Sequence, residues 1–106
     1  MGNKARALDE FLRRVEARFG DSVQEIILFG SYARGDYDEE SDIDVLIVGD
    51  VDFDELMSIV TDILLEYGEL VSPIVIKLGE FKRREDSFIK MVLREGKVLY
   101  SSTSTS

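Results

Sequence analysis

One stretch of sequence decides the fold: Phe29-Gly-Ser-Tyr-Ala-Arg-Gly-Asp-Tyr-Asp-Glu-Glu-Ser-Asp-Ile-Asp-Val-Leu-Ile-Val48. It begins where one apolar run ends in Gly30-Ser31, and Asp42 and Asp44 open the next apolar run. Two carboxylates at positions i and i+2 of a strand project from the same face of a sheet. At about 4 Å and an effective dielectric constant near 20 they repel by about 4 kcal/mol. We therefore expect a cation to bind at Asp42 and Asp44.

The composition indicates one compact domain and restricts its chemistry. The chain has 106 residues, of which 44% are hydrophobic and 33% charged, and its formal charge is -9. Non-specific binding to nucleic acid depends on many Lys and Arg contacts, so this charge argues against direct nucleic-acid binding. The sequence has no cysteine and no histidine, which excludes thiolate and imidazole ligands. A metal site would use carboxylates and favour hard ions such as Mg²⁺ or Mn²⁺.

The ends of the chain and its hydropathy bear on domain limits and location. Residues 1–6 lack the apolar core of a signal sequence, and no apolar run approaches the roughly 20 residues that cross a bilayer. We expect a cytoplasmic protein that does not bind membranes. Residues 101–106 contain only Ser and Thr, so we expect one domain over residues 1–100 followed by a disordered tail.

Apolar spacing predicts three helices. Residues 8–19 have helical spacing and end at Gly20; residues 53–67 have the same spacing, with Asp52 as N-cap and Gly68 at the end. A third helix over residues 80–94 fits less well, because residues 82–86 are all charged. We interpret most of the phenylalanines as core residues, namely Phe11, Phe19, Phe53, Phe81 and Phe88.

Four short apolar segments predict strands over residues 24–29, 43–48, 70–76 and 97–100. The first two are apolar throughout and are typical of strands buried on two faces. Pro73 favours an edge position for the third, because proline lacks the N–H of a ladder hydrogen bond. The order of elements predicts an α/β domain with a mixed sheet covered by helices.

The decisive stretch resembles the minimal nucleotidyltransferases, small members of the DNA polymerase β superfamily, whose signature is Gly-Ser, ten residues, then Asp-x-Asp. Here Gly30-Ser31 is followed by residues 32–41 and then by Asp42-Ile43-Asp44. The subsidiary patterns Gly-Ser-x-Ala-Arg-Gly and Ser-Asp-Ile-Asp are also present. The resemblance implies a small nucleotidyltransferase fold and is more specific than a lone glycine-rich loop.

The resemblance also implies roles for the matching residues. Gly30 and Ser31 would bind the triphosphate, since glycine lets a phosphate approach and the start of a short helix favours anions. Arg34 would lie close to the nucleotide. Asp42 and Asp44 would be the catalytic residues and would bridge two Mg²⁺ ions during transfer of a nucleotidyl group. A capping or turn role for these residues is the plainer interpretation of each alone.

A third carboxylate of the family is not evident in this sequence. The strand that should carry it reads Glu69-Leu-Val-Ser-Pro-Ile-Val-Ile76, and Ser72 occupies the aligned position. Glu69, at the beginning of that strand, would lie on the opposite face unless a bulge turns it. Loss of this acid would weaken the binding of one metal ion and the activation of the nucleophile more than it would weaken nucleotide binding.

Two functions remain open. The first is a metal-dependent nucleotidyltransferase that moves an NMP group, most simply AMP from ATP, to a hydroxyl. The resemblance implies the antitoxin of a HEPN/MNT toxin-antitoxin module, with a HEPN toxin as partner and a tyrosine of that toxin as acceptor; a homo-oligomer is the other assembly expected. The alternative is a catalytically degenerate module that binds a nucleotide or covers its partner. An aminoglycoside-type enzyme would need an acceptor-binding domain that this chain lacks.

Two charged segments have plainer interpretations. We expect an acidic loop to face water and bind no metal; it comprises Asp36, Asp38, Glu39 and Glu40. A basic group is also expected to face water, although it offers charges for phosphates or an acidic partner; it comprises Lys77, Lys82, Arg83 and Arg84.

Overall fold

The structure is a computed structural model that describes residues 3–102. In chain order the elements are α1 (Lys4–Phe19), a three-ten turn η1 (Gly20–Ser22), β1 (Val23–Phe29), α2 (Gly30–Arg34), β2 (Ile43–Gly49), α3 (Phe53–Tyr67), β3 (Val71–Ile76), α4 (Leu78–Arg83), α5 (Ser87–Glu95) and β4 (Lys97–Ser101). None of these helices is long and apolar enough to cross a membrane.

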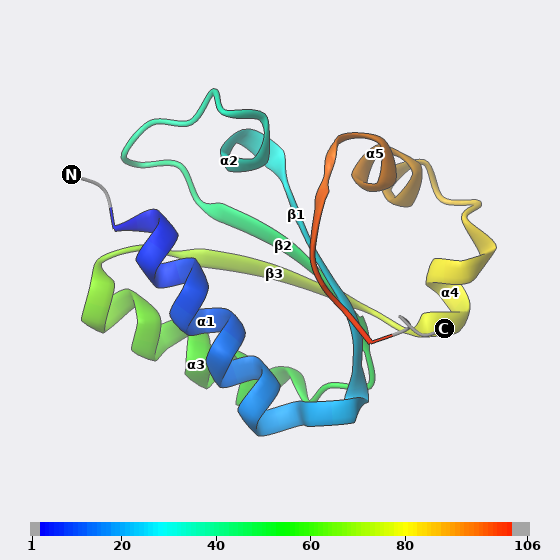
Figure 1. Ribbon diagram of the computed structural model, residues 1–106, viewed down its shortest axis with the longest axis horizontal. Helices are drawn as coiled ribbons and strands as arrows, with labels where there is room; N and C mark the ends of the chain where they lie inside the picture. The colour runs from blue at the N-terminus through cyan, green and yellow to red at the C-terminus, as the bar shows by residue number, and fades with distance from the viewer. Residues whose placement is uncertain (1–2, 103–106) are drawn as a thin grey trace.

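The strands form one mixed sheet in the order β3-β2-β1-β4. β1 runs antiparallel to β2 and to β4, whereas β2 and β3 are parallel and are joined through α3. Figure 1 shows β2 beside β1 and β3, with α2 at the end of β1. The mixed sheet and the edge position of Pro73 are therefore confirmed.

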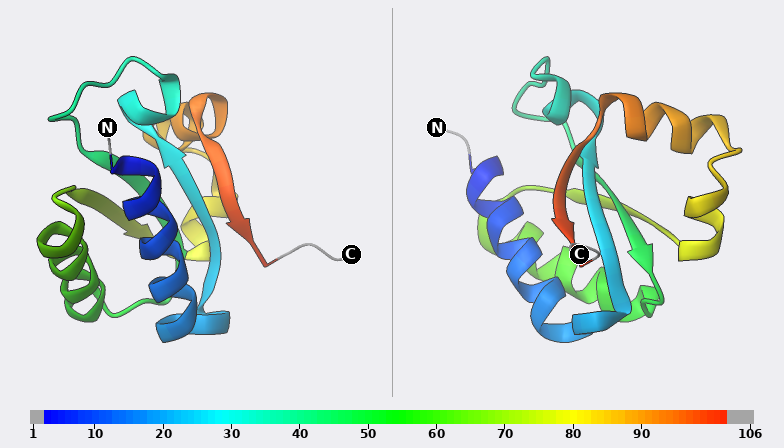
Figure 2. Two further views of the ribbon diagram at one scale, coloured as in Figure 1. Left: turned by 60° about the vertical axis from the view of Figure 1, so that its left-hand side comes forward. Right: turned by 45° about the vertical axis from the view of Figure 1, so that its right-hand side comes forward.

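Helices cover both faces of the sheet, and the two central strands are buried on both sides, as predicted. Figure 2 shows the strands between α1 with α3 on one side and α4 with α5 on the other. Along β2, Ile43, Val45 and Ile47 pack in the core beneath α1 and α3. Leu46 and Val48 pack in the second core, beneath α4 and α5. Since side chains alternate along a strand, Asp44 projects on the α4 and α5 face.

The two long helices end where the sequence predicts, and α3 also begins there, whereas α1 begins at Lys4, four residues before the predicted start at residue 8. The side chain of Asp52 accepts a hydrogen bond of 3.1 Å from the Glu55 N–H at the start of α3, and Gly68 ends that helix. Gly20 follows α1. The prediction that Phe53 is a core residue is wrong: its side chain, at the first position of α3, is 52% exposed.

The predicted helix over residues 80–94 is two helices, α4 and α5. Arg84 ends α4 in the left-handed conformation at φ 56°, which no right-handed helix can continue. The Asp86 side chain then accepts a hydrogen bond of 2.7 Å from the Phe88 N–H and caps α5. The charged block, residues 82–86, is exposed, as predicted. It forms the corner between α4 and α5.

The end of the described chain extends the sheet slightly. β4 includes Ser101, which pairs with Glu25, and the Ser102 N–H donates to the Gln24 carbonyl oxygen at 2.9 Å. The predicted tail therefore begins too early by these residues. Residues 103–106 lie outside the described part of the chain, so a disordered tail there stays a prediction.

We expect Arg84→Gly to raise the free energy of unfolding by up to about 1 kcal/mol. Glycine adopts positive φ freely, whereas an L-residue in the left-handed region costs about 1–2 kcal/mol, and the greater entropy of unfolded glycine offsets part of the gain. Arg83→Gly is the control. Arg83 is the last residue of α4, where glycine is a poor helix former, so this substitution should lower the free energy of unfolding by up to about 1 kcal/mol. Urea unfolding measures both, and equal destabilisation by the two substitutions would contradict the prediction.

Candidate functional site

The turn after β1 brings Gly30 against Asp44. Phe29, the last residue of β1, pairs with Asp44 in β2, so the next residue passes directly over the aspartate side chain. Gly30 has φ 81°, and a Cβ atom there would overlap Oδ2 of Asp44. Only glycine satisfies both the backbone angle and the close approach. The Gly-Ser end of the motif and its Asp-x-Asp end are thus in contact.

Asp42 and Asp44 reach the same region of the sheet, as predicted. Asp44 is half-buried in β2 beside Ser72 of β3, and Asp42 is exposed one residue before β2 begins. The Ser72 hydroxyl donates a hydrogen bond of 3.1 Å to Oδ2 of Asp42. Both carboxylates therefore lie next to Ser72, on the face of the sheet that carries α4 and α5.

The electrostatics around Asp44 oppose its ionisation. Burial raises the pKa of Asp44 above its ordinary value, and the neighbouring charge of Asp42 raises it further. The Arg34 guanidinium lowers the same pKa and is the weakest of the three influences. Without a cation, the fold keeps two anionic groups together at a cost in stability.

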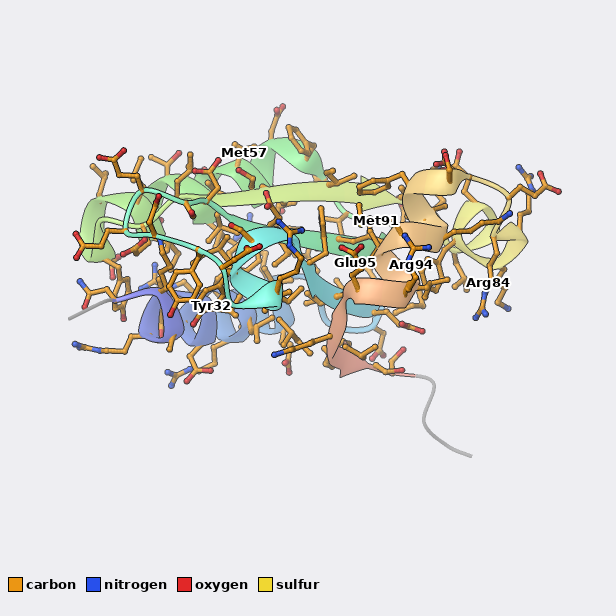
Figure 3. The ribbon with its side chains drawn as sticks, turned by 90° about the horizontal axis from the view of Figure 1, so that it is seen from above. Tyr32, Met57, Arg84, Met91, Arg94 and Glu95 are labelled. Carbon is orange, nitrogen blue, oxygen red and sulfur yellow. The ribbon has the colours of Figure 1, made fainter. Side chains whose placement is uncertain are left out.

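Arg34 is held between two acids at the end of α2. Its Nε lies 3.2 Å from Oδ2 of Asp36, and its Nη1 lies 3.7 Å from Oε1 of Glu95 on α5. Figure 3 shows Glu95 on α5 beside α2, whereas Tyr32 of α2 lies over α1. Arg34 contributes positive charge at Asp44, but its ion-pair partners are carboxylates of this chain. Its predicted contact with a nucleotide stays a prediction.

Glu69, the candidate for the third acid, has another partner. Its Oε1 lies 2.7 Å from Nζ of Lys4, in an ion pair whose side chains are only 5% and 13% exposed. It precedes β3 instead of lying in it. Among residues 3–102 no group of three acids is placed to hold a metal ion. The site therefore has two carboxylates and a serine hydroxyl.

Lys4 is the residue that the sequence reasoning missed. A signal was present, because Lys4 lies on the same helical stripe as Leu8, Phe11 and Val15, all of them buried. A lysine on a buried stripe needs compensating acceptors. The sequence did not show where these acceptors come from.

The donor set fits a hard divalent ion. Two carboxylates and a hydroxyl supply only oxygen, which Mg²⁺ prefers, and a cation would offset both the burial and the neighbouring Asp42 charge that raise the pKa of Asp44. A cavity of about 480 Å³ also exists between α1 and α3, lined in part by Arg18, Glu55 and Ile59. These two helices cover the face of the sheet opposite Asp44, so the cavity takes no part in this site.

The comparison with protein families decides the assignment. The model of the nucleotidyltransferase domain matches residues 8–100. The chain belongs to the nucleotidyltransferase domain family. This nucleotidyltransferase is 48% identical over 99 residues to the provisionally named protein adenylyltransferase MJ0604 of Methanocaldococcus jannaschii, covering 92% of this chain and 99% of the relative.

Two further comparisons agree. Protein adenylyltransferase MntA of Thermococcus cleftensis is 39% identical over 84 residues, covering 78% of this chain and 79% of the relative. A crystal structure of a toxin-antitoxin with AMP-PNP superposes with a TM-score of 0.66 at 18% identity, covering 90% of this chain and 74% of the other. That identity supports the fold alone. The predicted α/β nucleotidyltransferase fold is confirmed.

We expect Gly30→Ala to destabilise this nucleotidyltransferase more than Gly35→Ala. Both glycines have positive φ, at 81° and 89°, so each substitution should cost about 1–2 kcal/mol of unfolding free energy. Only at Gly30 does the new Cβ overlap Asp44, whereas nothing lies within 4 Å at Gly35. The overlap should add about 1–3 kcal/mol. Urea unfolding measures both losses.

Removing the carboxylate tests the cause of that difference. In an Asp44→Ala background the excess cost of Gly30→Ala should shrink, because the two substitutions share one contact. If the excess persists in full, the overlap with Asp44 is not its source.

We expect Asp44→Asn to stabilise the metal-free protein at neutral pH. An acid whose pKa is raised by folding destabilises the fold above that pKa, and the penalty is relieved as pH falls through it, since the folded state takes up the proton first. The gain in unfolding free energy should be up to about 1 kcal/mol at pH 7 and should vanish toward about pH 4.

Urea titrations across this pH range measure the gain. Asp62→Asn, at an exposed acid of α3, is the matched control and should change stability little at any pH. A loss of stability in Asp44→Asn at pH 7 would contradict the assignment of repulsion and burial to this residue.

Proposed function

We propose that this nucleotidyltransferase is a protein adenylyltransferase that moves AMP from ATP to a hydroxyl of a partner protein. One observation carries the proposal: the half-buried Asp44 is held beside Asp42, directly beneath the Gly-Ser turn. A cluster of that kind suits a metal-bound polyphosphate, because the acids bind the metal and the turn receives the phosphates.

Each residue of the predicted site then has a task. Gly30 leaves room above Asp44, and Ser31 lies in the first turn of α2, where backbone N–H groups have no partner within the helix and favour phosphate oxygens. Asp42 and Asp44 hold the metal. Arg34 adds positive charge beside them after exchanging a carboxylate partner for the nucleotide.

The reaction balances with these groups. A hydroxyl oxygen of the acceptor forms a bond to the α-phosphorus of ATP, the bond to the pyrophosphate oxygen breaks, and the hydroxyl proton passes to a carboxylate or to water. Magnesium ions, when bound, would neutralise phosphate charge and lower the pKa of the hydroxyl. Asp42 and Asp44 would hold that metal beneath the Gly-Ser turn.

Support for the nucleotide and the partner comes from the similar proteins. MntA of Thermococcus cleftensis is named a protein adenylyltransferase, and the superposed crystal structure is of a toxin-antitoxin with an ATP analogue. By analogy we propose ATP as the nucleotide and a tyrosine of a HEPN toxin as the acceptor.

Ser72 favours one alternative, a module that binds its partner without chemistry. It stands where the family resemblance implies a third acid, and its hydroxyl donates to Asp42. A hydroxyl donor reduces the charge available to a second metal, so nucleotide binding would survive better than transfer.

Transfer of labelled AMP tests the proposal. The protein is incubated with labelled ATP, Mg²⁺ and a HEPN toxin as the candidate acceptor, and label on the toxin is measured. We expect transfer by the wild type and a loss of at least about 100-fold in Asp42→Asn, on the scale of losing a group that stabilises the transition state. Asp62→Asn is the matched control and should retain full activity.

Ser72→Asp separates the enzyme from the binding module. If the wild type transfers no label but Ser72→Asp does, the natural protein is the degenerate module. A tight complex with the partner that is indifferent to Asp42→Asn, without transfer by either protein, overturns the proposed enzyme.

A further inference from the structure

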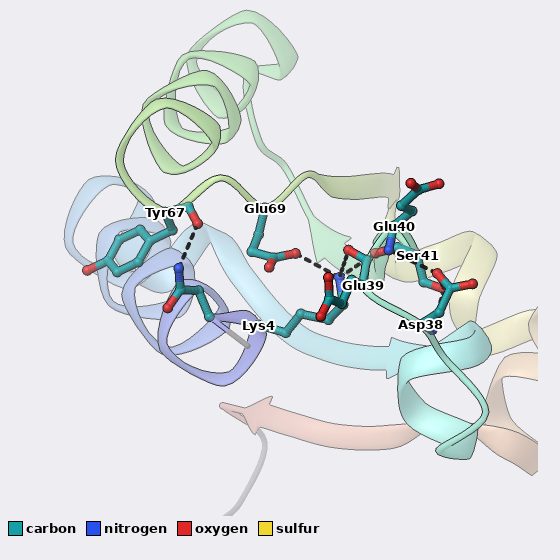
Figure 4. A network of polar contacts seen from close by, with 8 residues as sticks. Lys4, Asp38, Glu39, Glu40, Ser41, Tyr67 and Glu69 are labelled. Atoms are coloured by element: carbon teal, nitrogen blue, oxygen red, sulfur yellow. Dashed lines mark hydrogen bonds and ion pairs between the residues drawn. The ribbon is translucent and has the colours of Figure 1, made fainter. Parts of the chain in front are cut away.

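Lys4 forms a buried three-way contact that includes the carbonyl of Ser41, the residue before Asp42. The residue is only 4% exposed, and its Nζ donates to Oε1 of Glu69 at 2.7 Å, to the Ser41 carbonyl at 2.7 Å and to the Glu39 carbonyl at 3.3 Å. Figure 4 shows the ammonium group where α1, the acidic loop and the segment before β3 meet. These three parts of the chain converge on one charge.

The contact satisfies Lys4 completely, which explains why the fold tolerates it. An ammonium group has three N–H donors, and each has an acceptor here. Glu69 supplies the opposite charge that burial of a cation requires. Removing either partner would leave the other as a poorly compensated charge in a site with little access to water.

The position of Asp42 depends on this contact. Ser41, whose carbonyl Lys4 holds, is the residue before Asp42, and β2 begins only at Ile43. Residues 38–41 also make local hydrogen bonds: Asp38 accepts from the Glu40 N–H and the Ser41 hydroxyl, the Ser41 N–H donates to the Asp38 carbonyl, and the Asp38 N–H donates to the Ser41 hydroxyl. These local contacts fix the conformation of the turn. The hydrogen bonds from Lys4 connect the turn to α1.

Asp44 needs no such support. It lies within β2, whose backbone pairs with β1 on one side and β3 on the other. The two acids are therefore positioned by different means: Asp44 by the sheet, and Asp42 by the Ser72 hydroxyl on its carboxylate together with a lysine from the first turn of α1 that holds the preceding residue. Disturbing Lys4 should move Asp42 and leave Asp44 in place.

We propose that Lys4, neutralised by Glu69, is the positioning residue that holds Asp42 for metal binding. The inference rests on the proposed function, because it takes the two aspartates as the metal site. It also gives Glu69 a role: this carboxylate acts as the counter-ion of Lys4 and does not replace the missing third acid.

The test compares Lys4→Met with Arg14→Met. Methionine retains most of the length of each side chain and removes its charge. Arg14 also lies on α1 and pairs with Glu10 and Glu66, far along the helix from the acidic loop. Mn²⁺ is titrated into each protein and followed by electron paramagnetic resonance, and amide hydrogen exchange is measured over residues 36–42.

We expect the Mn²⁺ dissociation constant to rise about 10-fold in Lys4→Met, as is usual when support for a metal ligand is lost, and exchange in residues 36–42 to accelerate. Arg14→Met should lose stability but keep the wild-type affinity and exchange. Glu69→Gln, which preserves an acceptor without the charge, should weaken Mn²⁺ binding less than Lys4→Met does. If Lys4→Met does not fold, the Mn²⁺ affinity of Glu69→Gln tests the role of Lys4 in its place.

The outcomes separate the two proposals. If the wild type binds Mn²⁺ and Lys4→Met, or Glu69→Gln in its place, binds it as tightly as Arg14→Met does, the role of Lys4 is overturned while the metal site stands. If the wild type does not bind Mn²⁺ at all, the proposed function fails first, and the inference about Lys4 fails with it.

Discussion

The close approach of Gly30 to Asp44 is the constraint on which the site depends. Antiparallel pairing of β1 with β2 places the last residue of one strand opposite the first acid of the other, so the turn that follows must pass over a carboxylate. That turn has no room for a Cβ atom and requires a positive φ. The spacing between Gly-Ser and Asp-x-Asp is thus the length of loop that returns the chain from the end of β1 to the start of β2. The spacing of the motif therefore follows from the pairing of β1 with β2.

The neighbours of the acidic pair reduce the negative charge that Asp42 and Asp44 bring together. Burial and mutual repulsion both disfavour the ionised form of Asp44, and a third acid in β3 would add to the repulsion. Ser72 occupies that place and donates to Asp42, so it offsets negative charge where an acid would increase it. The metal-free fold is easier to maintain with serine, while cation affinity is lower. Arg34 acts in the same direction from α2 by lowering the pKa of Asp44.

The parts of this structure that sequence reasoning could predict are those set by local rules. Helical spacing and the Asp52 cap located α3, and the apolar runs located the central strands, because these signals act within a few residues. The break at Arg84 was missed because a non-glycine residue in the left-handed region has no signature in residue type. The partner of Glu69 was missed for another reason: Lys4 lies 65 positions away in the chain, and only the tertiary fold brings the two together.

The two faces of the sheet differ: one carries the larger hydrophobic core, and the other carries Asp44. α1 and α3 cover one face, where the larger core lies. On the other face α4 and α5 cover Leu46 and Val48, yet Asp44 remains only half-buried and Ile74, two residues beyond Ser72, is 41% exposed. An active site that served ATP alone would gain from closure, because excluding water strengthens its electrostatics. An open face beside the acids is what a domain needs when a second protein must bring its hydroxyl to the α-phosphate and complete the enclosure itself.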